Sequence, residues 1–126
     1  MSQTFKKQER LCSKKLIAQL FERGTSLSVF PIRAIWLETG LNCDFPAQVV
    51  VSVPKKKIKK AVERNSIKRR MRESYRKNKH LLYEQLENYG KQIALVLIYQ
   101  SDEEKSYEEI NDKIIVTLQR LAKKVE

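Results

Sequence analysis

Metal-ligating and paired catalytic side chains are scarce in this sequence. Cys12 and Cys43 are its only cysteines, no Cys-x-x-Cys motif occurs, and His80 is the only histidine. A tetrahedral Cys/His zinc site takes four such ligands, so the sequence predicts no metal site in the chain. Two isolated thiols are typical of proteins that work in a reducing cytoplasm.

Clusters of carboxylates, which a metal-dependent nuclease needs, are also missing. Asp44, Asp102 and Asp112 stand apart, and His80 has no second histidine as an acid–base partner. The acidic run at residues 102–104 lies in a predicted turn, where a solvated loop is a commoner interpretation than a metal site. No Gly-rich phosphate-binding loop is present. We therefore expect no catalytic residue in the chain and no small-molecule substrate.

Long apolar stretches are absent as well. The longest apolar run is Ile93–Tyr99, whereas a membrane-spanning helix takes about 20 residues. The N-terminal stretch MSQTFKKQERL has no apolar core of a secretory signal. Only three glycines and three prolines occur, which favours regular elements joined by short loops. These features predict a cytoplasmic protein with no membrane partner.

Positive charge is what the sequence has in excess, and it is concentrated in one segment. The 126 residues carry a net charge of +11. Residues 55–79 hold 13 of the 26 Lys and Arg residues and 2 of the 15 Asp and Glu residues, so the rest of the chain is neutral. One basic segment on a neutral scaffold indicates a localised site for a polyanion.

Hydrophobic periodicity and capping residues predict three helices and three or four strands. The helices are expected over residues 13–23, from near 58–61 into the eighties, and after a capping box at Ser106 and Glu109. The strands are expected over residues 29–38, 45–53 and 91–99, with a short additional one near 26–29. In the first long strand, Ile32, Ala34 and Trp36 should point to one face of the sheet, and Arg33, Ile35 and Leu37 to the other.

This order, α-β-β(-β)-α-β-α, predicts a single domain over residues 1–126 with an ordered core at about 9–124. The fold class is α/β (α+β): a small α-β sandwich with one mixed sheet of about four strands and three helices.

The basic segment should form a helix with separate apolar and basic sides. Its apolar stripe consists of Ile67, Met71, Tyr75, Leu82 and Leu86. Asn65, Arg69, Arg72 and Arg76 fall within an arc of about 60° to the side of this stripe. A solvated charged face is the ordinary interpretation of a basic helix, but the near absence of acidic residues favours nucleic-acid binding. Charge alone does not separate RNA from DNA.

Residues 52–76 read SVPKKKIKKAVERNSIKRRMRESYR and resemble the signature of the bacterial ribonuclease P protein component. The matching residues are Ser52-Val53, Lys55-Lys56, Ala61-Val62, Arg64-Asn65, Lys68-Arg69 and Arg72-Glu73, with Arg10-Leu11 and Phe21-x-x-Gly24 nearer the N-terminus. The resemblance covers residues 5–122. Ser66 stands where the family has a basic residue, and one additional residue lies between Lys56 and Ala61.

The resemblance implies a protein that assists a catalytic RNA in removing the 5′ leader from precursor tRNA. The RNA would perform the endonucleolytic hydrolysis and would hold most of the Mg²⁺ that the reaction needs. The β-α-β crossover around the basic helix would be left-handed, whereas general rules favour a right-handed one. By position in the resemblance, Arg64, Asn65, Lys68, Arg69 and Arg72 are implied to bind the catalytic RNA. Three further candidates come from the residues themselves: Arg76 lies in the basic arc, and Lys55 and Lys56 sit just before the helix, where they can add charge near the phosphates.

The resemblance also implies a cleft between the first helix and one face of the sheet, which would hold the single-stranded leader. Phe21 and Trp36 match its aromatic lining, and aromatic rings stack on exposed bases with little sequence preference. Ordinary core packing is the alternative for both residues.

Three other functions are compatible with a basic helix. A non-catalytic ribosomal or RNA-chaperone protein would bind RNA without affecting precursor processing. A sequence-specific DNA-binding module would need a recognition helix after a tight turn, and no such pattern is present. A stand-alone nuclease would cleave RNA without an RNA partner.

Overall fold

The computed structural model describes residues 5–126, so the first four residues of the N-terminal stretch lie outside the described part. The elements, in chain order, are the 3₁₀ turn η1 (Lys7–Glu9), α1 (Lys14–Arg23), β1 (Thr25–Val29), β2 (Ile32–Glu38), β3 (Ala47–Ser52), α2 (Ala61–Asn78), α3 (His80–Asn88), β4 (Ile93–Tyr99) and α4 (Tyr107–Lys124). The predicted order is confirmed, including the short additional strand, except that the basic helix is divided into α2 and α3.

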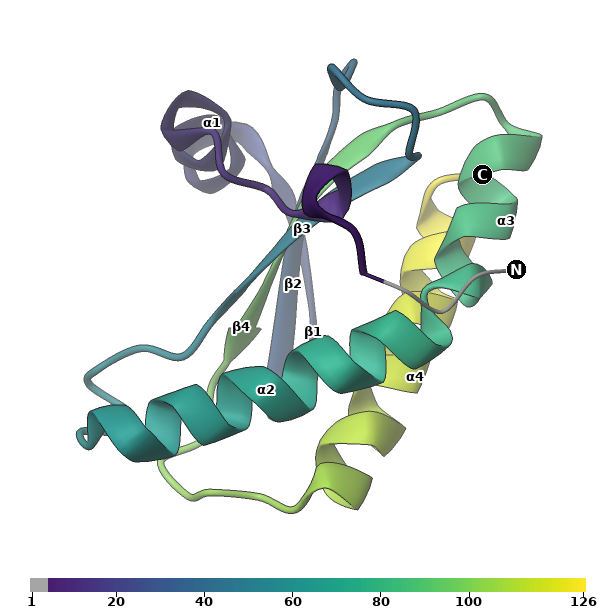
Figure 1. Ribbon diagram of the computed structural model, residues 1–126. Coiled ribbons are helices and arrows are strands. Elements are labelled where there is room, and N and C mark those ends of the chain that lie inside the picture. Colours follow the sequence, from purple (N-terminus) through teal and green to yellow (C-terminus); the bar gives the residue numbers. More distant parts are fainter. Residues whose placement is uncertain (1–4) are drawn as a thin grey trace.

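The strands form one mixed sheet in the order β1-β2-β4-β3 (Figure 1). β1 and β2 form an antiparallel hairpin, β2 pairs antiparallel with β4, and β4 pairs parallel with β3. β3, α2, α3 and β4 therefore form a β-α-β crossover between two adjacent parallel strands. The hand of this crossover stays a prediction of the family resemblance.

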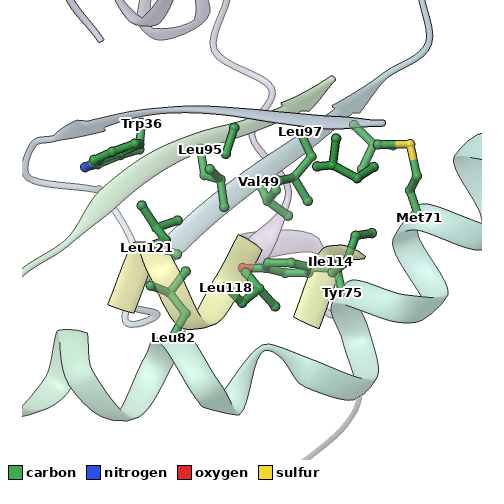
Figure 2. Close-up of a cluster of buried hydrophobic side chains, with 14 of the residues drawn as sticks. Trp36, Val49, Met71, Tyr75, Leu82, Leu95, Leu97, Ile114, Leu118 and Leu121 are labelled. Carbon is green, nitrogen blue, oxygen red and sulfur yellow. The ribbon is translucent and has the colours of Figure 1, made fainter. Parts of the chain in front are cut away.

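The two faces of the sheet are covered by different helices. The larger core lies between the sheet and α2, α3 and α4, and the labelled side chains of Figure 2 belong to it. A smaller cluster lies on the other face, where Leu20 of α1 packs with Ile35 of β2 and Val96 of β4. β4 is buried on both faces, as its continuous apolar run predicts. The predicted alternation along β2 is confirmed, because Ile32, Ala34 and Trp36 belong to the larger core.

The prediction of one long basic helix is wrong. α2 ends at Asn78 and α3 begins at His80, so four α-helices pack on the sheet within the described residues. At the junction, Asn78 Nδ2 donates to the Ser74 carbonyl oxygen at 2.8 Å, and Lys79 turns its side chain into the interior. The buried apolar stripe continues through the break on the same side, so periodicity alone does not reveal it.

A buried ion pair joins the N-terminal segment to the α2–α3 junction. Lys79 Nζ and Tyr83 Oη each donate to Glu9 Oε2 at 2.6 Å, and the Lys6 backbone N–H donates to Glu9 Oε1 at 3.0 Å. Glu9 is 1% exposed and Lys79 is 4% exposed. Burial opposes ionisation of the Glu9 carboxyl, but the hydrogen bonds and the Lys79 charge outweigh it and hold its pKa below 4.5. The N-terminal segment is therefore held by a charged carboxylate.

Gly24 tests how closely α1 approaches the sheet. A Cβ at this position would clash with the Leu20 carbonyl oxygen and would lie 2.6 Å from Ile35 Cγ2. We expect Gly24→Ala to lower the free energy of unfolding by about 1–3 kcal/mol, measured by chemical denaturation. Gly40→Ala is the matched control, because a Cβ there meets nothing within 4 Å. Equal effects of the two variants would contradict the close approach of α1 to β2.

Glu9→Gln tests the buried ion pair. We expect the variant to lose about 3–5 kcal/mol of stability at neutral pH, because it removes the carboxylate that pairs with the buried Lys79 ammonium. The pKa of Glu9 is lower in the folded chain, so its stabilisation is complete above the ordinary pKa of 4.5 and is lost as the pH falls below it. The stability difference between wild type and variant should therefore shrink as the pH falls below 4.5. Glu84→Gln, at an exposed position of α3, should show no such dependence.

Candidate nucleic-acid interface

α2 has an apolar side toward the core and a basic side toward solvent. Ile67, Met71 and Tyr75 are fully buried on the apolar side. Of the predicted RNA-binding residues on α2, Asn65, Arg69 and Arg72 are exposed, and Arg64, Lys68 and Arg76 are partly exposed. All six lie on one regular helix, as the sequence predicts. They form the basic face of α2.

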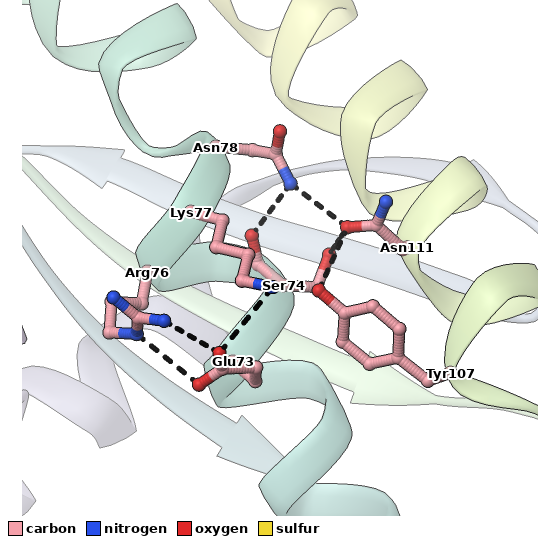
Figure 3. Close-up of polar contacts among 7 residues, drawn as sticks. All are labelled: Glu73, Ser74, Arg76, Lys77, Asn78, Tyr107 and Asn111. Atoms are coloured by element: carbon pink, nitrogen blue, oxygen red, sulfur yellow. Dashed lines mark hydrogen bonds and ion pairs between the residues drawn. The ribbon is translucent and has the colours of Figure 1, made fainter. Parts of the chain in front are cut away.

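Polar contacts with α4 hold α2 in this orientation. Figure 3 shows Ser74 Oγ donating to Asn111 Oδ1 at 2.7 Å, and Asn78 Nδ2 donating to the same oxygen at 3.0 Å. Lys77 Nζ lies 5.5 Å from the ring centroid of Tyr107, a distance at which a cation is attracted to an aromatic face. These contacts lie beside the basic face and limit rotation of α2 about its axis.

Two of the predicted RNA-binding arginines have partners within the protein. Arg64 Nη1 donates to the carbonyl oxygens of Ile58 at 3.0 Å and Lys59 at 2.8 Å, so this guanidinium closes the loop before α2. Arg76 donates to both carboxylate oxygens of Glu73, at 2.6 and 3.2 Å. This pairing lowers the pKa of Glu73 and raises the pKa of Arg76. Both arginines have to exchange or share these partners if they bind phosphate.

Other cations of the interface are available to a ligand. The side chains of Lys68, Arg69 and Arg72 make no hydrogen bond or ion pair with another residue of the described range 5–126. Lys55 and Lys56 are exposed in a turn directly before α2. An ammonium or guanidinium with no internal partner can bind a phosphate without first breaking an ion pair.

On the opposite side of the sheet, α1 exposes one aromatic ring. Phe21 is 58% exposed, although its neighbour Leu20 is fully buried against the sheet. The alternative of ordinary core packing is therefore wrong for Phe21. Ile17, one turn earlier on α1, is partly buried against the smaller cluster on this face, and so is Leu37 of β2. The face offers an exposed ring next to an apolar surface, and leader binding there stays a prediction.

Trp36 does not share this face. It is 8% exposed and packs in the larger core, near Leu95 and Leu121 in Figure 2. The expectation that Phe21 and Trp36 line one cleft is wrong, and for Trp36 the alternative of core packing is confirmed. The reason is the alternation of β2, which points Ile35 rather than Trp36 toward α1.

The structure adds Arg10 to the cations near α2. A pocket of about 190 Å³ lies between the N-terminal segment, β3 and α2, and both Arg10 and Arg72 line it. The two arginines are 62 residues apart in the chain, so no local pattern brings them together. The sequence showed Arg10 only as part of a short family motif, and its position beside the basic face depends on the tertiary structure.

Two other features of the described residues bear on function. Residues 5–126 contain no group of three or more His, Cys, Asp or Glu side chains that could hold a metal ion. In the same range, no helix has both the length and the apolar character needed to cross a bilayer.

Comparison with known proteins identifies the family. The model of the ribonuclease P family matches residues 5–122. The ribonuclease P protein component of Porphyromonas gingivalis is 32% identical over 116 residues, which cover 92% of this chain and 85% of that protein. The RNase P protein of Staphylococcus aureus shares the fold with a TM-score of 0.70 at 20% identity, over 91% of this chain and 95% of that one. The RNase P protein of Thermotoga maritima does so with a TM-score of 0.70 at 24% identity, over 89% and 96%.

The family model spans nearly the whole chain, and the relative from Porphyromonas gingivalis matches at similar coverage. The residues of the basic face, apart from Arg76, are also among those that carry the family resemblance in the sequence. This chain therefore belongs to the ribonuclease P protein family and takes part in tRNA processing as the protein component of an endoribonuclease.

Proposed function

We propose that this chain binds the catalytic RNA of ribonuclease P through the basic face of α2 and the single-stranded 5′ leader of precursor tRNA through the α1 side of the sheet. The observation that carries the proposal is the row of cations on α2, in which Lys68, Arg69 and Arg72 have no partner among the described residues. A guanidinium binds two phosphate oxygens at once and stays charged, which suits a folded RNA backbone. Asn65 adds a group that both donates and accepts hydrogen bonds.

The leader would lie along α1, with Phe21 as the stacking residue. A ring that is 58% exposed presents a face to a base, and the neighbouring apolar surface excludes water from one side. Mature tRNA lacks the leader, so contacts of this kind favour substrate over product. The protein would thus contribute by binding substrate more tightly than product, and not through a catalytic group of its own.

Hydrolysis is assigned to the RNA in this proposal. The described residues offer no set of three carboxylate, His or Cys ligands, so they do not fit a protein-held Mg²⁺. Mg²⁺ would be held mainly by the RNA partner. Cys12 and Cys43 are both free thiols, which suits the reducing cytoplasm that we propose as the compartment.

A processing assay with and without the cognate catalytic RNA, at low Mg²⁺ concentration, tests the proposal. We expect cleavage of the leader only when the RNA is present, and faster cleavage when the protein is added to it. A non-catalytic ribosomal or RNA-chaperone role, the alternative function, would leave the rate unchanged. Cleavage by the protein alone would contradict the assignment of the chemistry to the RNA.

Arg72→Ala tests the basic face. We expect weaker binding to the catalytic RNA and a slope of log Kd against log salt concentration that is smaller by about one, because one phosphate contact is lost. Arg120→Ala is the matched control, since Arg120 is an exposed arginine of α4 outside the basic face. Filter binding over a series of salt concentrations measures both quantities. An unchanged slope for Arg72→Ala would exclude a phosphate contact at this residue.

Phe21→Ala tests the leader contact. We expect a loss of about 1–3 kcal/mol in affinity for precursor tRNA with a leader, through lost stacking, and no loss for mature tRNA. Phe30→Ala is the matched control, because Phe30 is exposed to a similar extent, 61%, at the β1–β2 turn. Affinities of the assembled ribonucleoprotein for both tRNAs provide the comparison. Equal losses for the two tRNAs would assign Phe21 a structural role instead.

A further inference from the structure

We propose that the pocket between the N-terminal segment, β3 and α2 binds one nucleotide of single-stranded RNA, with its phosphate between Arg10 and Arg72. The inference rests on the proposed function and adds a site to it. The pocket has a volume of about 190 Å³, and none of its lining residues is acidic. Two guanidinium groups and no carboxylate make the pocket complementary to an anion.

The Arg10 side chain is positioned so that its guanidinium N–H groups stay available to a ligand. Its guanidinium carbon lies 5.5 Å from the ring centroid of Phe5, which in turn makes an edge contact with the buried ring of Tyr75 at 5.8 Å between centroids. The cation–π contact with Phe5 uses none of the guanidinium N–H groups in a hydrogen bond, so they can still bind phosphate oxygens. Arg72, on the α2 side of the pocket, has no partner among the described residues.

The remaining lining suits a base and a ribose. Leu11 and residues Val49–Val51 provide apolar surface against which a base can pack. β3 is the edge strand of the sheet, and the Leu11 N–H donates to the Val49 carbonyl oxygen at 2.9 Å. The peptide N–H and C=O groups of successive residues point alternately to the two edges of a strand. Those of Val51 therefore point to the same outer edge of β3 as those of Val49, past the residues that pair with the N-terminal segment. They are placed to bind a base edge or a 2′-hydroxyl, groups that single-stranded RNA exposes.

The N-terminal wall of the pocket is rigid before any RNA binds. The buried contact of Glu9 with Lys79 and Tyr83 fixes the residue next to Arg10. One residue earlier, the Gln8 carbonyl oxygen accepts a hydrogen bond from Gln48 Nε2 of β3 at 3.0 Å. A wall held at both positions loses little conformational freedom on binding, which favours a specific site over a mobile basic tail.

Cys12 provides a direct probe, because it is exposed and lines the pocket. In a Cys43→Ser background, the alkylation rate of Cys12 by a maleimide is measured with the protein alone, with the catalytic RNA, and after further addition of precursor tRNA or mature tRNA. The control protein carries Cys12→Ser, Cys43→Ser and Gln119→Cys, which places the single thiol at an exposed position of α4. We expect protection of Cys12 and none of the thiol at position 119.

The arms of this experiment identify the source of the nucleotide. Protection by the catalytic RNA alone assigns the pocket to that RNA. Protection that appears only with leader-bearing precursor, and not with mature tRNA, assigns it to the leader. If the RNAs bind but Cys12 reacts at the rate of the free protein in every arm, the pocket proposal fails while the proposed function stands. If the catalytic RNA does not bind at all, the proposed function fails.

Arg10→Ala separates pocket binding from general shielding of Cys12 by RNA on α2. We expect this variant to weaken binding of the RNA that protects Cys12 on the order of tenfold, since it removes hydrogen bonds to a charged group. The Cys12 protection should fall in parallel. Arg10→Lys should keep the salt dependence but recover only part of the affinity, because it keeps the charge and loses the two-pronged contact.

Lys7→Ala is the matched control, at an exposed cation of the same N-terminal segment that does not line the pocket. It should leave the Cys12 protection unchanged. Circular dichroism of each variant at the assay temperature shows whether the fold is kept. Full protection and full affinity in a folded Arg10→Ala variant would overturn the proposal.

Discussion

The packing of α2 by its apolar side is the constraint on which the basic face of α2 depends. Ile67, Met71 and Tyr75 are completely buried, and burial of an Ile or Met side chain stabilises the fold by about 1.5–3 kcal/mol. A helix that rotated about its axis would expose these side chains and bring guanidinium groups into the core, which is costly. Side-chain directions on a helix are fixed relative to one another, so burial of the apolar side determines where Arg69 and Arg72 point.

The sheet separates the basic face of α2 from the exposed ring of α1, although both layers pack on the same strands. One face of β4 packs under α1, and the other packs under α2, α3 and α4. The basic face of α2 and the exposed ring of Phe21 therefore belong to opposite layers, and the N-terminal segment pairs with the edge strand β3 through Arg10 and Leu11. The pocket lined by Arg10 and Arg72 lies at this edge.

The carboxylates near α2 are placed so that they do not neutralise the cations of its basic face. The segment 55–79 contains two carboxylates, and in the structure Glu73 pairs with Arg76 at the side of the row. The buried carboxylate of Glu9 is used internally by Lys79, a residue of the basic segment that points inward. The basic segment thus serves two purposes: its outer cations remain available to phosphate, and Lys79 joins the N-terminal segment to the core.

Local patterns in the sequence determined the elements, the burial of β4 and the basic face of α2, because helix and strand periodicity alone decide which side chains share a side. Three features were decided only by the tertiary structure. The break at Lys79 depends on a partner, Glu9, that is 70 residues away. The face occupied by Trp36 depends on which side of the sheet α1 covers, and the pocket depends on the pairing of Arg10 with β3. Contacts between residues far apart in the chain leave no periodic signal, so helix and strand periodicity cannot predict them.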